Sequence, residues 1–125
     1  MSHFTTIQTQ IKDLDALRSA LAEMNLPLFP NAKARGYSTT SITGDFVIRL
    51  NGPYDIAVNK QHDSTYGLTT DWWAGHVEKE VGPKFGRLLQ LYGVHKAMRE
   101  ARKKGLSVQR KAQADGSIKL TVMGV

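Results

Sequence analysis

Hydrophobic residues recur along the chain at helical spacing in two segments, and these segments are predicted to be helices. The first is 12–25, where four apolar side chains are three or four positions apart: Leu14, Leu17, Leu21 and Met24. Asp13 is placed to cap the first turn, because its carboxylate can accept from a free backbone N–H. Asn25 and Pro27 are expected to end the helix.

The second predicted helix is longer and extends from about 76 to 104. Its apolar face repeats every 3.6 residues and comprises Val77, Val81, Phe85, Leu88, Leu91, Tyr92, His95 and Met98. Gly82-Pro83 is placed to separate a short first turn from the main helix. Beyond Gly93 the apolar face drifts, as a bend or a change of packing partner would produce. Gly105 suits the C-terminal cap.

The remaining apolar segments are short and are separated by turn residues, which is typical of β-strands. Asn51-Gly52 and Asp115-Gly116 are hairpin turn sequences. Segment 26–36 contains two prolines, an asparagine and a glycine, and is predicted to be a loop. The predicted strands are 2–10, 37–43, 45–51, 54–59, 64–70, 106–112 and 118–123.

Together the elements predict an α+β fold. We expect an antiparallel sheet of about five or six strands with two helices packed on one face, in the order β-α-β-β-β-α-β-β. A chain of 125 residues is enough for a single domain spanning 1–125. No apolar stretch approaches the roughly 18 residues that cross a bilayer, and a secretory leader is not recognisable, so we expect no membrane insertion.

Charge is distributed unevenly along the chain. Residues 1–78 carry a formal charge of −2 and residues 79–125 carry +8, within a net charge of +6. The densest cluster of cations lies toward the end of the long predicted helix and comprises Lys96, Arg99, Arg102, Lys103 and Lys104. This cluster can bind phosphates or an acidic protein surface. Alternatively, its cations only complement the helix dipole and stay solvated.

Residues with catalytic or metal-binding chemistry are sparse. The chain has no cysteine, which excludes thiol nucleophiles and thiolate metal sites. The four histidines have no metal-ligand spacing, and glycine-rich phosphate loops and nucleophile elbows are absent. A histidine placed like His95, in the middle of an apolar helix face, is more often a hydrogen-bonded core residue than a base. We therefore predict no catalytic, metal or cofactor site and favour a non-enzymatic protein.

Aromatic residues offer an alternative function. Trp72 and Trp73 would point in opposite directions in an extended chain, so at least one of them can be exposed. Exposed aromatics on a sheet beside a basic helix suit single-stranded RNA, because bases stack and phosphates pair with cations. The closely spaced aromatics of an RNA-recognition strand are, however, missing.

Several separated motifs occur in a characteristic order. They are Ser2-His3-Phe4, the helix with Leu17 and Leu21, Tyr54-Asp55-Ile56, Tyr66, Asp71-Trp72-Trp73, Ala101-Arg102-Lys103-Lys104-Gly105 and Asp115-Gly116-Ser117-Ile118. In this order they resemble the uncharacterised family named for the plastid hypothetical reading frame thirty-five, over nearly the whole chain. The resemblance implies a source among cyanobacteria, algal plastids or cyanophages and a photosynthesis-linked setting, without an activity. It also implies a glycine directly after Tyr-Asp-Ile, where this chain has Ala57.

From these observations we expect a small protein-binding adaptor, or an assembly or regulatory factor, that docks on an acidic protein or complex. The basic helix end would steer association, and Trp72 or Trp73 with Tyr66 would anchor it. The alternative is a module that binds single-stranded RNA or DNA, and self-association through an open strand edge also stays open. The expected compartment is the cytoplasm of a bacterium or infected host, or the plastid stroma.

Overall fold

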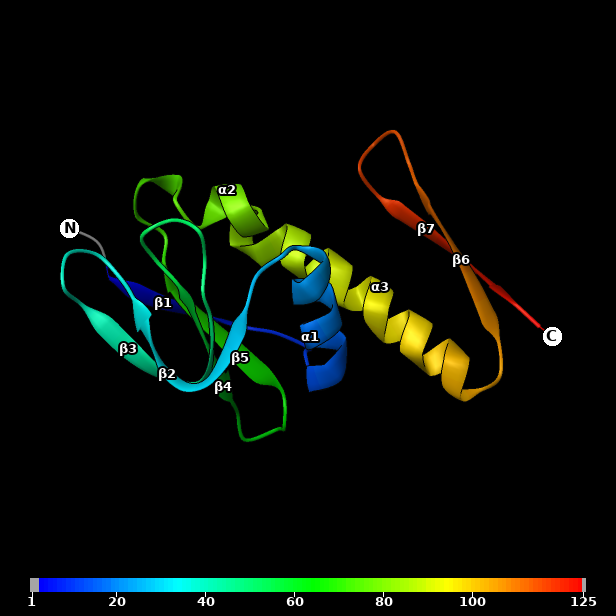
Figure 1. Ribbon diagram of the computed structural model, residues 1–125, viewed down its shortest axis with the longest axis horizontal. Helices are drawn as coiled ribbons and strands as arrows, with labels where there is room; N and C mark the ends of the chain where they lie inside the picture. Colours follow the sequence, from blue (N-terminus) through cyan, green and yellow to red (C-terminus); the bar gives the residue numbers. More distant parts are fainter. Residues whose placement is uncertain (1–2, 125) are drawn as a thin grey trace.

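Five strands form one antiparallel sheet, and two further strands form a separate ribbon (Figure 1). The computed structural model describes residues 3–124, so Ser2, which we placed in the first strand, lies outside the described residues. The sheet has the order β1-β5-β4-β3-β2, with β1 at Phe4–Gln8, β2 at Leu28–Arg35, β3 at Ser41–Ile48, β4 at Ile56–Lys60 and β5 at Tyr66–Asp71. The ribbon pairs β6 (Ser107–Ala112) with β7 (Ile118–Met123). The α+β class is confirmed, whereas the strands divide into two sheets instead of one.

Two helices, α1 (Leu14–Glu23) and α3 (Gly86–Lys103), pack against each other and cover one face of the sheet. The Asp13 side chain caps α1 as predicted, since its Oδ1 accepts from the Ala16 backbone N–H at 3.0 Å. The main core lies between the helices and the sheet, and its members include Leu17, Leu21, Ile48, Ile56, Val58, Leu68, Phe85 and Leu88. None of the described helices is long and apolar enough to cross a membrane.

The predicted helix over 76–104 is broken near its start, where three short elements precede α3. They are η1 (Trp73–Gly75), α2 (Glu78–Val81) and η2 (Pro83–Phe85). As expected, Gly82-Pro83 separates the first turn from the main helix, with a φ of 86° at Gly82 that favours glycine. Lys84 and Phe85 are also left-handed, at φ 52° and 65°. The fully buried Phe85 side chain offsets this strain by packing in the core.

The prediction of a loop over 26–36 was wrong, because β2 occupies most of it and pairs with β3. β2 is an edge strand, and an edge strand tolerates a proline such as Pro30 whose missing N–H would have broken a central ladder. Asn31 adopts a left-handed φ of 47°, a conformation that is uncommon in strands and for which asparagine is enriched. The two strands predicted at 37–43 and 45–51 correspond to the one continuous strand β3.

The sheet curls so strongly that the end of β2 meets strands it does not pair with. The Asp55 backbone N–H, just before β4, donates to the Arg35 carbonyl at 3.0 Å. A Cβ at Gly36 would lie 2.5 Å from the ring of Phe4 in β1. The end of β2 therefore lies against Phe4 of β1 and against the residue that precedes β4.

Ala57 lies where the resemblance implied a glycine, and the curled sheet explains the demand for a small residue. It is fully buried in a second, smaller core with Ala34 and Val47. A Cβ at Gly44 would lie 3.1 Å from the Cβ of Ala57. The close backbone approach at this position is therefore made within the chain.

The ribbon folds back along α3, on the side away from the five-stranded sheet (Figure 1). Gly105 ends the helix with a φ of 72°, as predicted, and the Leu106 N–H closes the turn on the Ala101 carbonyl at 2.9 Å. Ile118 of the ribbon packs against the main core. The drift of apolar residues beyond Gly93 therefore coincides with a change of packing partner toward the ribbon.

Candidate functional site

A single buried carboxylate positions two exposed aromatic residues. Asp71, at the end of β5, is 1% exposed. Its Oδ2 accepts from the Tyr37 backbone N–H and its Oδ1 accepts from the Trp73 backbone N–H, each at 3.0 Å. Tyr37 lies in the turn between β2 and β3, so Asp71 joins two loops that are far apart in the sequence.

The side chains of Tyr37 and Trp73 contact each other at the protein surface. Their ring centroids are 5.7 Å apart and the ring planes are inclined by 75°, an edge-to-face arrangement. Tyr37 is 42% exposed and Trp73 is 45% exposed. We call these two residues the aromatic pair. Because the backbone of both is held by Asp71, the pair is presented in an organised geometry.

Trp72 points away from the aromatic pair and into the core. Its ring centroid lies 4.6 Å from that of Phe85, and the side chain is partly buried. The expectation that at least one of the adjacent tryptophans is exposed is met by Trp73. Ala74 and Gly75, at φ 57° and 73°, turn the chain directly after Trp73.

Tyr54 packs beneath this end of the sheet. It is 6% exposed and meets His76 edge to face, with centroids 5.3 Å apart. Burial raises the pKa of the Tyr54 phenol, and the negative charge of Asp71 adds to the shift. The phenol is thus a neutral group at physiological pH, and it serves packing more readily than proton transfer.

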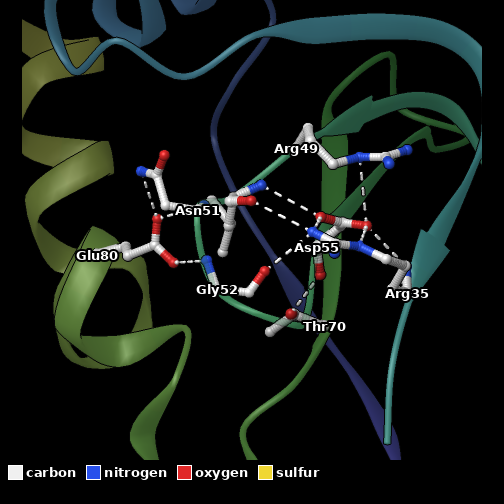
Figure 2. A network of polar contacts seen from close by, with 8 residues as sticks. Arg35, Arg49, Asn51, Gly52, Asp55, Thr70 and Glu80 are labelled. Carbon is white, nitrogen blue, oxygen red and sulfur yellow. Dashed lines mark hydrogen bonds and ion pairs between the residues drawn. The ribbon is translucent and has the colours of Figure 1, made fainter. Parts of the chain in front are cut away.

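A second buried carboxylate, Asp55, organises the 49–55 loop (Figure 2). It accepts from three donors of Arg35, the backbone N, Nε and Nη2, at 2.8–2.9 Å, and from the Leu50 N–H at 3.2 Å. Arg49 Nε lies 3.5 Å from the same group, and Thr70 Oγ1 donates to the Asp55 carbonyl at 2.7 Å. The network leaves this carboxylate fully engaged within the chain.

The pKa of Asp55 shows which interaction dominates. Burial alone would raise the pKa of this carboxyl, but hydrogen bonds from the Arg35 guanidinium and from the backbone of Arg35 and Leu50 outweigh burial and lower it. Asp55 therefore stays ionised and paired. We interpret it as a structural anion that ties β2 to the loop before β4.

The same loop is capped from α2. Glu80 accepts from the Asn51 backbone N–H at 2.8 Å, the Asn51 side-chain amide at 3.0 Å and the Gly52 N–H at 3.0 Å (Figure 2). The hairpin predicted at Asn51-Gly52 is confirmed, because β3 and β4 pair antiparallel, but its connection is a wider loop over 49–55. The ladder between β3 and β4 closes at Ile48 opposite Ile56, and the wider connection is held by Glu80 and Asp55.

The predicted basic cluster is partly neutralised by acidic residues of the same chain. Lys96 pairs with Asp13 and Glu100, Arg99 with Asp13 and Asp15, and Lys103 with Glu100, at N–O distances from 2.9 to 3.7 Å. The remaining two, Arg102 and Lys104, are exposed and have no ion pair among the described residues. Only part of the charge seen in the sequence is thus left without an ion pair among the described residues.

Tyr66 does not lie beside Trp73, although the two were predicted to form one anchoring surface. It begins β5, whereas Trp73 follows the end of that strand, and its ring meets Phe46 at a centroid distance of 6.4 Å. The guanidinium of Arg18 lies over the Phe46 ring at 5.6 Å. Tyr66 therefore belongs to the packing of the opposite end of the sheet.

His95 has a structural partner, and the described residues hold no cluster of three or more potential metal ligands. His95 Nε2 lies 2.8 Å from Glu23 Oε1, which also accepts from Arg110. His95 is therefore hydrogen-bonded as the sequence favoured, but it is partly exposed and lies outside the core.

Two residues of the site escaped the sequence-based selection of site residues, namely Tyr37 and Asp71. The Asp71-Trp72-Trp73 motif offered a signal for Asp71, because an aspartate can accept from the backbone N–H two residues later. Nothing in the sequence linked Tyr37 to that aspartate, because they are 34 positions apart.

Comparison with known proteins identifies a family and relatives that the chain matches in sequence. Residues 20–121 match the family model described as "Protein of unknown function (DUF1257)". The chain is 31% identical over 124 residues to "Uncharacterized protein ycf35" of Pyropia yezoensis, covering 98% of this chain and 96% of the relative. It is 28% identical over 124 residues to the protein of the same description in Guillardia theta, with the same coverage. No solved structure matches the chain.

Proposed function

The chain belongs to the family described as "Protein of unknown function (DUF1257)", and within it we propose a small non-enzymatic adaptor that docks on a partner protein through the aromatic pair. The observation that carries this proposal is the exposure of Tyr37 and Trp73 on one rigid support. Tyrosine and tryptophan dominate interface hot spots, because they bury a large area at a small entropic cost.

Preorganisation by Asp71 supports the docking role. A side chain that is already ordered before binding loses less conformational freedom when the complex forms. The Asp71 carboxylate fixes the backbone of both aromatic residues, and the edge-to-face contact restricts their rings. The pair therefore offers an anchor for an apolar or aromatic pocket of the partner.

The basic end of α3 has a separate role in this proposal. The turn that carries Tyr37 and the C-terminal end of α3 lie at opposite ends of the molecule (Figure 1). Arg102 and Lys104 would therefore steer an acidic partner or complex by long-range charge while the aromatic pair supplies the short-range contact. A photosynthesis-linked setting, in a bacterial cytoplasm or plastid stroma, is part of the same proposal.

The test is affinity capture from a cyanobacterial lysate with the wild-type chain, the variant Trp73→Ala and the matched control Phe29→Ala. Phe29 is 46% exposed and lies in β2, outside the aromatic pair, so its removal deletes a comparable exposed aromatic. We expect a protein that is retained by the wild type and by Phe29→Ala and lost with Trp73→Ala, in nuclease-treated lysate.

Equal recovery of the same proteins by all three chains would overturn the docking role of the aromatic pair. Recovery that disappears on nuclease treatment would replace the proposal with the nucleic-acid alternative. Circular dichroism of each variant establishes that the fold is kept, as expected for exposed side chains.

A further inference from the structure

We infer that the outer face of the β6–β7 ribbon binds B-form duplex DNA. This inference goes beyond the proposed adaptor function and shares no residue with the aromatic pair, although Arg102 and Lys104 take part in both proposals. The ribbon and the β2–β3 turn lie at opposite ends of the molecule (Figure 1). The two surfaces can therefore be tested independently.

The register of the ribbon defines its two faces. Arg110 and Ile118 lie on the inner face, because Arg110 bonds to Glu23 of α1 and Ile118 packs on the core. Residues of opposite parity form the outer face, where Gln109 lies opposite Thr121 and Lys111 lies opposite Lys119. All residues of this face are exposed: Ser107, Gln109, Lys111, Lys119, Thr121 and Met123.

The Lys111–Lys119 pair points to an anionic ligand. Like charges directly opposite each other on a β-ribbon destabilise it. No ion pair within the described residues involves either lysine, and the carboxylates on and beside the ribbon are engaged elsewhere. Glu23 is bonded to Arg110, and Asp115 in the turn accepts from the Ser117 N–H at 3.0 Å and from its hydroxyl at 2.6 Å.

The chemistry of the outer face matches base edges as well as phosphates. Lysine donates to guanine O6 and N7 or to phosphate oxygens, glutamine pairs with adenine, and the threonine methyl contacts the thymine methyl. Carboxylates are absent from the six outer-face residues. An acidic protein would provide partners for the two lysines but not for the glutamine and the threonine. The outer-face residues taken together therefore favour nucleic acid.

The shape of the ribbon selects duplex DNA. Two strands about 4.8 Å apart fit the major groove of B-form DNA, which is about 12 Å wide and admits a two-stranded ribbon. The major groove of A-form RNA is too narrow for this contact. Both outer edges of the ribbon are unpaired within the described chain, and α3 supports only its inner face.

The exposed cations at the end of α3 extend this surface. Arg102 and Lys104 lie directly before the ribbon in the chain, on either side of Lys103, and neither is paired among the described residues. Cations flanking a ribbon that enters the groove can contact the phosphates that border the groove. They would strengthen binding without contributing sequence preference.

The test is fluorescence anisotropy with a labelled DNA duplex of about 20 base pairs, titrated from about 50 mM to about 200 mM salt. The test variant is Lys111→Gln with Lys119→Gln. The matched control is Lys33→Gln with Lys60→Gln, which removes the same charge from exposed lysines of the five-stranded sheet. An RNA duplex of the same sequence and polyglutamate serve as competitors.

We expect the wild type and the control to bind the DNA duplex alike. The ribbon variant should bind the DNA duplex roughly tenfold or more weakly at low salt. The slope of log K against log salt concentration should be smaller by about 1.8, because two lysines that neutralise phosphates are lost. The RNA duplex and polyglutamate should compete weakly. Undetectable DNA binding at low salt, equal weakening in both double variants, or stronger competition by RNA or polyglutamate would each overturn the inference.

Discussion

Glu23 of α1 accepts two hydrogen bonds from the guanidinium of Arg110 in β6, each 2.9 Å long. These contacts, together with Ile118, attach the ribbon to the helical layer. The hydrogen bond from Arg110 is the largest cause that lowers the pKa of Glu23 to about 2, and the contact with His95 adds to it. The attachment of the ribbon is therefore coupled to pH.

The variant Glu23→Gln tests this coupling. A folded-state pKa below the ordinary value of 4.5 means that the contribution to stability is complete above about pH 5 and is lost as the pH falls toward 2. About a third of the side chain of both Glu23 and Arg110 is exposed, and solvent screens their interaction. We therefore expect the free energy of unfolding of the wild type to be only about 1 kcal/mol higher than that of the variant at pH 7. Urea unfolding at pH 7 and near pH 2 checks it, and an equal difference at both pH values would contradict it.

Asp55→Ala is expected to lower the free energy of unfolding by about 3–5 kcal/mol, because it leaves the donors of Arg35 and the Leu50 N–H without their buried partner. The matched control is Asp45→Ala. Asp45 also accepts from a backbone N–H, that of Lys60, but it is exposed, so its loss should cost about 1 kcal/mol or less. Chemical denaturation measures both, and similar midpoints for the two variants would show that Asp55 is dispensable.

Two glycine substitutions should shift stability in opposite directions. A Cβ at Gly44 would collide with the backbone oxygen of Phe46, so Gly44→Ala should destabilise the fold by about 1–3 kcal/mol. Gly93 is exposed in the middle of α3, and an added methyl group would meet nothing within 4 Å, so Gly93→Ala should stabilise by about 0.5–1 kcal/mol. Thermal unfolding monitors both, and a stabilising Gly44→Ala would refute the close packing of the curled sheet.

Asp71→Asn should loosen the aromatic pair. An amide retains one acceptor oxygen and presents its own NH₂ to the second backbone N–H, so one of the two loops is released. We expect increased acrylamide quenching of tryptophan fluorescence. In a chain that also carries Trp73→Phe, Asp71→Asn should no longer increase the quenching, because the remaining Trp72 packs on Phe85. An increase that persists in this double variant would show that the quenched residue is Trp72.

The helices were predictable because their information is local. The leucine spacing and Asp13 defined α1, and Gly105 defined the end of α3. The break at Gly82-Pro83 was visible for the same reason, since a proline restricts its own turn. Strand β2 escaped prediction, because Pro30 and Asn31 are tolerated only where a curled sheet leaves the strand at its edge.

Only some residues of the candidate site could be predicted from the sequence. Trp73 was selected because adjacent tryptophans point in opposite directions in an extended chain, so that one of them can be exposed, but its partner Tyr37 was not selected. The basic cluster was recognised by its density, yet its pairing with Asp13, Asp15 and Glu100 was not apparent. Glu100 lies within the same helix as the cluster, whereas Asp13 and Asp15 belong to a segment that only folding brings near.

The α+β class, the capped helices, the excess of positive charge in the second half and the family resemblance were all predictable from the amino-acid sequence. Each of these depends on neighbouring residues or on composition. Three relationships were established only by the folded chain: Asp71 holds Tyr37 beside Trp73, Asp55 is buried against Arg35, and Lys111 and Lys119 share an open face. Those relationships depend on how the strands curl and pair, and pairing between distant segments leaves no periodic signal in the chain.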